Sequence, residues 1–225
     1  MMRYKFECTF SDAQKVFLEI TSEKTGKRYI PMVRENDSFV CELDLNPSDI
    51  YKYIFVIDDN IRLIDWSAPF TIPTEDGQIF SCIAINANGE ILTYDFEPSI
   101  YVKDFGFCND TIENGELIYR RAFSRKDKKV CVRIEYTDVL GFHQSSILWY
   151  KPGGEFFLQS SNIVWSDDEK MDNIIEWHYI EISDEMPTGK WKVKYFIDGL
   201  YILEDYFVIT PTTYGIESGI LKTSI

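Results

Sequence analysis

The stretch Ile50–Phe70 constrains the fold of this chain more than any other segment. It begins with Ile50–Ile57, a run that is apolar on both faces except at Lys52. A strand of this kind is typical of the centre of a sheet that is covered on each side. Asp58–Asn60 then supplies turn chemistry, and Ile61–Asp65 predicts a partner strand. We therefore expect a hairpin at the centre of the first half of the chain.

Further strands are predicted around this hairpin by runs of alternating or β-branched residues. They cover Tyr4–Phe10, Val16–Thr21, Tyr29–Val33, Phe39–Leu45 and Gln78–Asn86. Pro31 cannot donate a backbone hydrogen bond, so we expect an edge strand or a bulge where it occurs. Short strands separated by turns about every 8–12 residues indicate an antiparallel β-sandwich.

The second half of the chain shows the same pattern. Its predicted strands cover Leu117–Phe123, Val130–Thr137, Ile147–Tyr150, Glu155–Gln159, Glu176–Ile182, Gly189–Ile197 and Leu200–Ile209. We expect Ser124–Lys129 to be the turn that pairs the first two of these strands, and Trp165–Asn173 to be an acidic loop. Asp198 and Gly199 form a dipeptide that is typical of a type I′ hairpin turn.

The two halves are separated by a segment rich in turn residues. Asn88-Gly89 and Pro98 interrupt it, and we expect a protease-sensitive connection between Asn86 and Pro98. No segment has helical periodicity. The sequence therefore predicts an all-β chain of two consecutive antiparallel immunoglobulin-like β-sandwich domains, at residues 1–94 and 95–225, with a short tail from Pro211 to Ile225.

Charge and hydropathy exclude two classes of partner. The formal net charge of the 225 residues is −14, whereas a protein that binds nucleic acid needs a basic face. No uncharged apolar run approaches the roughly 20 residues that span a bilayer, and the N-terminus lacks the apolar region of a secretory signal. We expect a soluble cytoplasmic protein with neither nucleic-acid nor membrane partners.

Cysteine and histidine usage gives no support for a metal site, a cofactor or a catalytic centre. Five cysteines lie far apart without a CxxC pair, so we expect buried free thiols (Cys8, Cys41, Cys82, Cys108 and Cys131). His143 and His178 are the two histidines, and neither lies near a nucleophile motif. Asp167–Asp172 offers oxygens to calcium but lacks the spacing of an EF-hand loop, so a solvated loop is the preferred interpretation.

Basic residues cluster at one place in this acidic chain. The cluster contains Arg120, Arg121, Arg125, Lys126, Lys128 and Lys129. It is interpreted either as a charged hairpin tip or as a protein-interaction site for an acidic partner, including a second copy of the chain.

The aromatic residues of the second half suggest a groove. Those considered are Trp149, Tyr150, Trp165, Trp177 and Trp191. The neighbours of Trp149 and Trp191 alternate as core positions do, so we expect these two rings to be buried.

Several motifs in the first half carry a resemblance to a known family. They are VFLEI, SFVCELDL, YKYIFVIDD with its turn, the SAP segment and the closing strand. Together they make residues 16–85 resemble the glycogen-binding family of carbohydrate-binding modules, found on starch-branching enzymes and on the β-subunit of AMP-activated kinase. The resemblance implies a β-sandwich that stacks α-glucan rings on two tryptophans.

The family's sugar-stacking residues are replaced in this sequence. Its first tryptophan corresponds to the loop Thr21–Arg28, which has no aromatic residue, and its second falls near Ile61 or Arg62. The family's lysine on the central strand falls near Ile54. The remaining candidates for carbohydrate binding are Trp66, Arg62, Tyr51 and Tyr53, although alternation with Phe55 and Ile57 favours the core for both tyrosines.

We therefore expect a non-catalytic binding or scaffold protein that has a protein partner or self-associates. The alternative is an α-glucan (glycogen or starch) binding protein that uses a relocated aromatic platform. A weaker alternative is a hydrolase with an unrecognised site.

Overall fold

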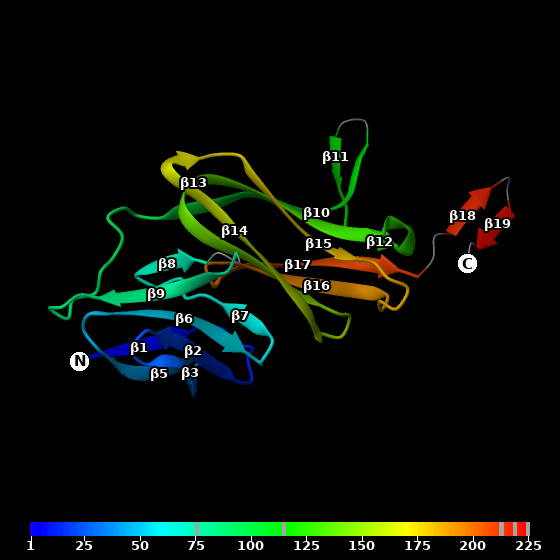
Figure 1. Ribbon diagram of the computed structural model, residues 1–225. Coiled ribbons are helices and arrows are strands. Elements are labelled where there is room, and N and C mark those ends of the chain that lie inside the picture. The colour runs from blue at the N-terminus through cyan, green and yellow to red at the C-terminus, as the bar shows by residue number, and fades with distance from the viewer. Residues whose placement is uncertain (75–76, 114–115, 212–213, 218–219, 224–225) are drawn as a thin grey trace.

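The structure is a computed structural model that describes residues 1–74, 77–113, 116–211, 214–217 and 220–223 (Figure 1). In this part of the chain nearly all regular structure is β, and the strands form immunoglobulin-like antiparallel sandwiches. The predicted all-β fold class is therefore confirmed. None of the helices in the described ranges is long and apolar enough to cross a bilayer.

The first sandwich consists of two sheets. Its outer sheet has the order β1 (Met2–Cys8), β5 (Ser38–Leu45) and β4 (Val33–Glu35). The other, here called the β6 sheet, has the order β3 (Gly26–Pro31), β2 (Val16–Ser22), β6 (Asp49–Ile57), β9 (Ile79–Ile85) and β8 (Phe70–Pro73), with β7 (Ile61–Leu63) beside β6. The strand predicted to be central is thus in the middle of its sheet.

The second sandwich is built around β13 (Lys129–Tyr150), which belongs to both of its sheets. The β15 sheet contains β11 (Glu116–Tyr119), β10 (Ser99–Glu113), the first part of β13 and β15 (Ile174–Glu181). The β16 sheet contains β14 (Phe156–Met171), the second part of β13, β16 (Gly189–Ile197), β17 (Leu200–Thr210) and β12 (Ala122–Ser124). Asp138 and Gly141 have positive φ angles of 56° and 92° where β13 passes between the sheets.

Three predictions for the second half are wrong. The segment Leu117–Phe123 does not pair with Val130–Thr137, because β10 and β15 flank that part of β13. The expected turn instead contains a 3-10 helix, η1 (Arg125–Asp127), capped by Ser124. The expected acidic loop is instead the end of β14, which runs to Met171, and the register of its pairing with β13 shifts between Ser166 and Met171. A separate hairpin of β18 (Tyr214–Glu217) and β19 (Ile220–Thr223) lies within the segment expected to be a short tail.

The two sandwiches are packed through the two strands that are apolar on both faces. In β6, Tyr53 and its odd-numbered neighbours enter the first core, whereas Ile54 and Val56 pack near Phe142 and Ile163 of the second half. In β13, Ile147 and Trp149 enter the second core, whereas Leu148 and Tyr150 join the first. Each buried aliphatic side chain of this kind contributes about 1.5–3 kcal/mol. The β6 sheet and the β16 sheet therefore form the inner layers of one stack (Figure 1).

Candidate functional site

The two tyrosines proposed for carbohydrate binding lie in the first core. Tyr51 is 1% and Tyr53 0% exposed, and the Tyr53 ring packs edge-on against Phe6 with the centroids 4.9 Å apart. The Tyr53 hydroxyl donates a hydrogen bond of 2.9 Å to Asp65. Because these rings face inward, neither offers a free surface to a sugar. Tyr51 and Tyr53 are therefore core residues and not candidates for carbohydrate binding.

Arg62 and Trp66 lie on the side of the first sandwich that faces the second. The Arg62 guanidinium forms an ion pair of 2.9 Å with Glu19. Trp66 is 56% exposed and lines a cleft of about 650 Å³ between the two halves, together with Tyr101 and Lys170. Of the four proposed sugar contacts, Trp66 is the one with a large exposed ring.

Two of the positions at which the resemblance places sugar contacts, Ile54 and Ile61, are covered by protein, whereas the loop Thr21–Arg28 is largely exposed. Ile54 and Ile61 are buried, and Phe142 and Ile163 of the second sandwich pack against the Ile54 cluster. The outer face of the β6 sheet is therefore occupied in part by the β16 sheet. An α-glucan chain would have to displace the second sandwich to reach Ile54.

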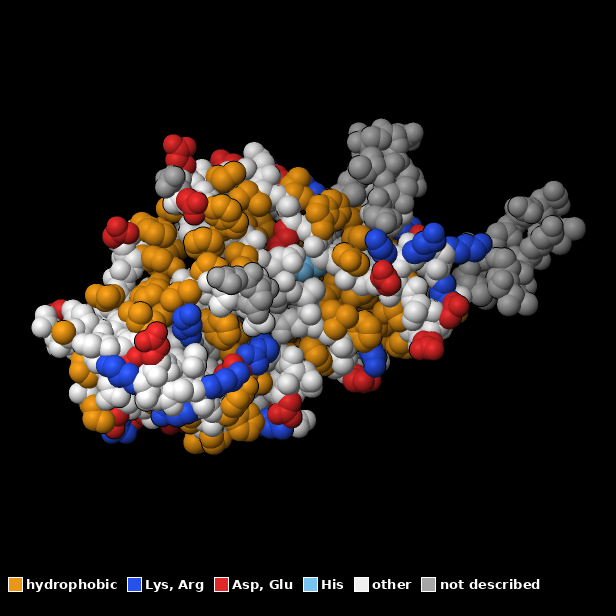
Figure 2. Space-filling model, in the orientation of Figure 1, with side chains coloured by type: hydrophobic (Ala, Val, Ile, Leu, Met, Phe, Trp, Pro, Cys, Tyr) orange, Lys and Arg blue, Asp and Glu red, His pale blue; other side chains and the backbone are white. Residues whose placement is uncertain are grey.

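The basic cluster is largely paired with acidic residues of its own chain. Arg120 pairs with Asp127, and its guanidinium also lies over the Phe123 ring. Arg121 pairs with Asp205, and Arg125 with Asp184. Figure 2 shows this group of Lys and Arg side chains at the end of the second half where β12 lies. The arginines of the cluster therefore hold the turn against β17 and the loop after β15.

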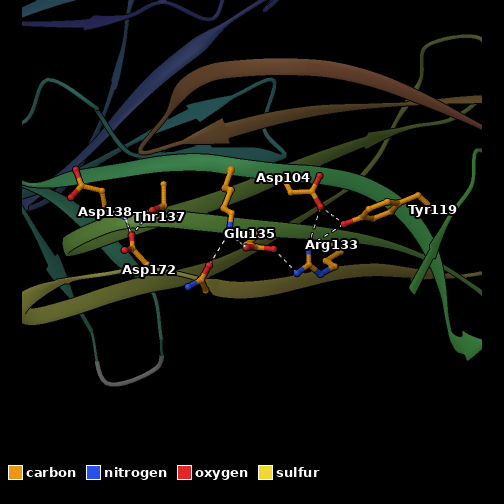
Figure 3. A network of polar contacts seen from close by, with 9 residues as sticks. Asp104, Tyr119, Arg133, Glu135, Thr137, Asp138 and Asp172 are labelled. Atoms are coloured by element: carbon orange, nitrogen blue, oxygen red, sulfur yellow. Dashed lines mark hydrogen bonds and ion pairs between the residues drawn. The ribbon is translucent and has the colours of Figure 1, made fainter. Parts of the chain in front are cut away.

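A polar network covers the outer face of the β15 sheet (Figure 3). Arg133 is at its centre, with Nη1 3.1 Å from Asp104 Oδ2 and Nη2 2.7 Å from Glu135 Oε2. The Tyr119 hydroxyl accepts a 3.0 Å hydrogen bond from the same guanidinium. Lys103 donates to Glu135, and the hydrogen bonds from Lys103 and Arg133 hold the pKa of Glu135 below its ordinary value. The network therefore fixes charged side chains on the sheet surface, where Arg133 and Lys103 balance Asp104 and Glu135.

A row of exposed apolar side chains on β15 lies beside this network. Ile175, Trp177 and Tyr179 are 47%, 44% and 54% exposed. In the sheet register Trp177 is opposite Arg133, and the Lys129 ammonium lies 4.9 Å from the centroid of the Tyr179 ring. Within the described ranges β15 pairs with β13 on one side and with no other strand. The row therefore lies on a sheet edge that no further strand of the described ranges covers, although the Asn162 side chain of β14 donates a hydrogen bond of 3.4 Å to the Trp177 backbone carbonyl.

Sequence reasoning missed a buried cluster between the sheets of the second sandwich. The Ser145 hydroxyl is 3.1 Å from His178 Nε2, and His178 Nδ1 is 3.0 Å from the Ser160 hydroxyl. The Tyr136 hydroxyl contacts both Ser145 and Glu176. Burial raises the pKa of Glu176, but hydrogen bonds from His178, Ser145 and Tyr136 outweigh it and hold that pKa below its ordinary value.

Ser145, His178 and Glu176 resemble a Ser–His–Glu arrangement in composition, but all three are buried. A nucleophile must contact its substrate. The cluster instead joins β13, β14 and β15 across the core, and the Tyr195 hydroxyl, 2.7 Å from that of Tyr136, extends it to β16. The signal that could have revealed it is a polar triplet, Gln144-Ser145-Ser146, inside a long strand. Among the described residues, no group of three or more His, Cys, Asp or Glu side chains is arranged to hold a metal ion.

A pocket of about 450 Å³ lies at the junction of the sandwiches. One wall comes from β6, β7 and the start of β9, and the other from β13 and β14. The Gln159 amide joins the walls: it accepts a hydrogen bond of 2.8 Å from the Arg62 backbone N–H and donates one of 2.7 Å to the Arg62 carbonyl.

Comparisons with known proteins give a likeness of fold only. No family model matches this chain, and no curated protein matches it. An immunoglobulin-like protein from Pseudomonas aeruginosa is similar in structure, with 13% sequence identity and a TM-score of 0.35. The alignment covers 50% of this chain and 97% of the Pseudomonas chain. A maltogenic amylase from S. marinus has 13% sequence identity and a TM-score of 0.28. That alignment covers 92% of this chain but only 28% of the amylase chain.

Proposed function

We propose that this chain is a non-catalytic cytoplasmic binding protein that associates with a second copy of itself through strand β15. The observation that carries the proposal is the open edge of β15 with Ile175, Trp177 and Tyr179 exposed along it. An open edge presents unpaired backbone donors and acceptors and is a template for another strand. The apolar row on this edge adds side-chain contacts to that pairing.

Two-fold symmetry makes the second copy a suitable occupant of this edge. An antiparallel pair of β15 strands centred on Trp177 places Ile175 of each copy opposite Tyr179 of the other. Directly opposed side chains lie about 4.5–5.5 Å apart, and aromatic pairs between strands contribute roughly 0.2–1 kcal/mol each. The same surface serves both copies, as a closed dimer requires.

A charge placed in the row tests this proposal. We expect the full chain to sediment as a dimer at about 100 µM, a concentration at which even a weak association is populated. Trp177→Lys should give a folded monomer with a modestly lower melting temperature, because the variant loses the association and places a lysine opposite Arg133. The matched control is Trp66→Lys, which changes a somewhat more exposed ring in the cleft and should remain dimeric. A monomeric wild-type chain, or a dimeric Trp177→Lys variant, would show that β15 is not the interface.

The α-glucan alternative retains one supporting observation, the exposed Trp66 ring in the cleft beside Tyr101. One aromatic ring contributes about 0.5–1.5 kcal/mol beyond its buried area, less than the cost of ordering a flexible glucan. We therefore expect no saturable binding of maltoheptaose at concentrations up to about 1 mM. A dissociation constant of about 1 mM would correspond to a binding free energy of roughly −4 kcal/mol. Saturable binding in a calorimetric titration that Trp66→Ala abolishes would instead establish the α-glucan function.

A further inference from the structure

His143 lies in the wall of the cleft between the sandwiches, and both of its ring nitrogens face acceptors. The residue is 3% exposed, with Nδ1 2.7 Å from Asp198 Oδ2 and Nε2 2.9 Å from the Leu140 carbonyl oxygen. An ionised carboxylate and a backbone carbonyl only accept hydrogen bonds, whereas a neutral imidazole has a single N–H donor. Both contacts are therefore satisfied when the ring carries a proton on each nitrogen.

The shared proton of this pair belongs to the histidine. The second carboxylate oxygen of Asp198, Oδ1, accepts a hydrogen bond of 2.7 Å from the Gln144 backbone N–H. Hydrogen bonds to both oxygens favour the ionised form of a carboxyl group. Aspartic acid ordinarily loses its proton near about pH 3.9, and imidazolium near about pH 6.5. An imidazolium–carboxylate pair is therefore the form that the geometry favours.

The surroundings of the ring add charges of both signs. The titratable side chains that line the cleft with it are three carboxyl groups, one amine and two phenols (Asp65, Glu97, Asp198, Lys170, Tyr94 and Tyr101). The Lys170 ammonium lies 2.8 Å from a carboxylate oxygen of Asp138. On β14 the residue opposite His143 is Val164. Burial lowers the pKa of His143, but the contacts with Asp198, Leu140 and Ser99 outweigh it and hold that pKa above its ordinary value.

Asp198 belongs to the turn through which the second sandwich contacts the first. The turn joins β16 to β17, and the Asp198 backbone N–H donates a hydrogen bond of 2.8 Å to the Gln144 carbonyl. Its next residue, Gly199, lies so close to the Ile64 carbonyl that a Cβ atom would collide with it. The His143–Asp198 contact therefore helps to fix the turn against both β13 and the first sandwich.

We propose that His143 is a proton-dependent switch at the junction of the sandwiches: the doubly protonated ring holds the Asp198–Gly199 turn in place, and loss of one proton loosens it. Deprotonation leaves one ring nitrogen as an acceptor facing another acceptor, so one of the two contacts is lost. Histidine is suited to this role because its charge changes in the physiological pH range. None of these residues belongs to the β15 row, so the inference does not depend on self-association.

The direction of the pH effect follows from the raised pKa of the folded state. The contribution of the pair to the free energy of unfolding is fully present below about pH 6.5, the ordinary pKa of histidine in an unfolded chain. It is lost as the pH rises through the higher pKa of His143 in the folded protein. Alkaline conditions should therefore loosen the junction, and mildly acidic conditions should tighten it.

An NMR titration of the full chain across about pH 5–9 tests the switch directly. The His143 ring should titrate above about pH 6.5, and the amide resonances of Gly199 and Ile64 should change with the same midpoint. Asp198→Asn should move that midpoint to lower pH, because it removes the charge while asparagine still suits the φ of 52°. The matched control, Glu97→Gln, removes an exposed carboxylate from the same cleft and should move the midpoint less.

Urea unfolding of the same proteins provides a second measurement. The loss of stability caused by Asp198→Asn should be larger near about pH 6 than at alkaline pH, where the wild-type ring has also lost its charge. An equal loss at both pH values would overturn the proposal. A wild-type His143 ring that titrates at or below about pH 6.5, or Gly199 and Ile64 resonances that do not follow it, would overturn the proposal as well.

Discussion

At the scale of single residues, Gly199 shows how closely the two sandwiches approach each other. Asp198 and Gly199 form the predicted hairpin turn, with positive φ angles of 52° and 82°. Asp198 accepts a 2.7 Å hydrogen bond from the Gln144 backbone N–H and lies 2.7 Å from His143 Nδ1. A Cβ atom on Gly199 would lie 1.9 Å from the carbonyl oxygen of Ile64 in the first sandwich. The turn therefore requires glycine both for its backbone angle and for its contact.

Gly199→Ala should destabilise the protein by about 2–5 kcal/mol, because it combines left-handed backbone strain with a backbone clash. The matched control is Gly89→Ala. Gly89 has a φ of 83°, but a Cβ there meets no atom within 4 Å, so its variant should lose only about 1–2 kcal/mol. Urea unfolding monitored by circular dichroism measures both changes. Equal losses in the two variants would contradict the role of the contact with Ile64.

At the scale of elements, the sequence predicts strands well where their burial depends on apolar side chains. The alternation in Gly189–Ile197 places Trp191 in the core and Lys194 outside it, and the structure agrees. Burial of Trp149 is likewise confirmed. The continuous strand β13 was not predicted, because Gln144 and Ser145 are polar.

Burial of such polar side chains depends on partners that are distant in the sequence. His178 lies 33 positions from Ser145, and Asp198 lies 54 positions from Gln144. The junction pocket was missed for the same reason, because its walls come from residues 54–79 and 144–163, which only the packed sandwiches bring together. Of the candidate residues, Trp66 could be placed at the surface, because it follows a hairpin and precedes Pro69. The acidic partners of the basic cluster could not be identified from the sequence, because nothing in the spacing of the residues shows which of them meet.

At the scale of the whole molecule, the two sandwiches share apolar packing rather than meeting only through a connecting segment. Leu148, Tyr150 and Phe196 of the second half belong to the core cluster of the first half. The Phe10 and Phe196 rings stack with their centroids 5.6 Å apart, and Lys194 pairs with Asp12 beside them. Separating the halves would expose these side chains to water, so the folded state of each half depends on the other.

We therefore expect one cooperative unfolding transition for the whole chain. Ile147 and Leu148 provide a matched pair, because these neighbours on β13 enter the second and the first core respectively. Replacing either by alanine should cost about 2–5 kcal/mol and should lower one midpoint that both halves share. Hydrogen exchange measured by mass spectrometry in intermediate urea follows peptides from each half separately. If Ile147→Ala exposed only peptides of the second half while the first stayed protected, the sandwiches would be independent units, and the packing of β6 against β13 would contribute little to the stability of either.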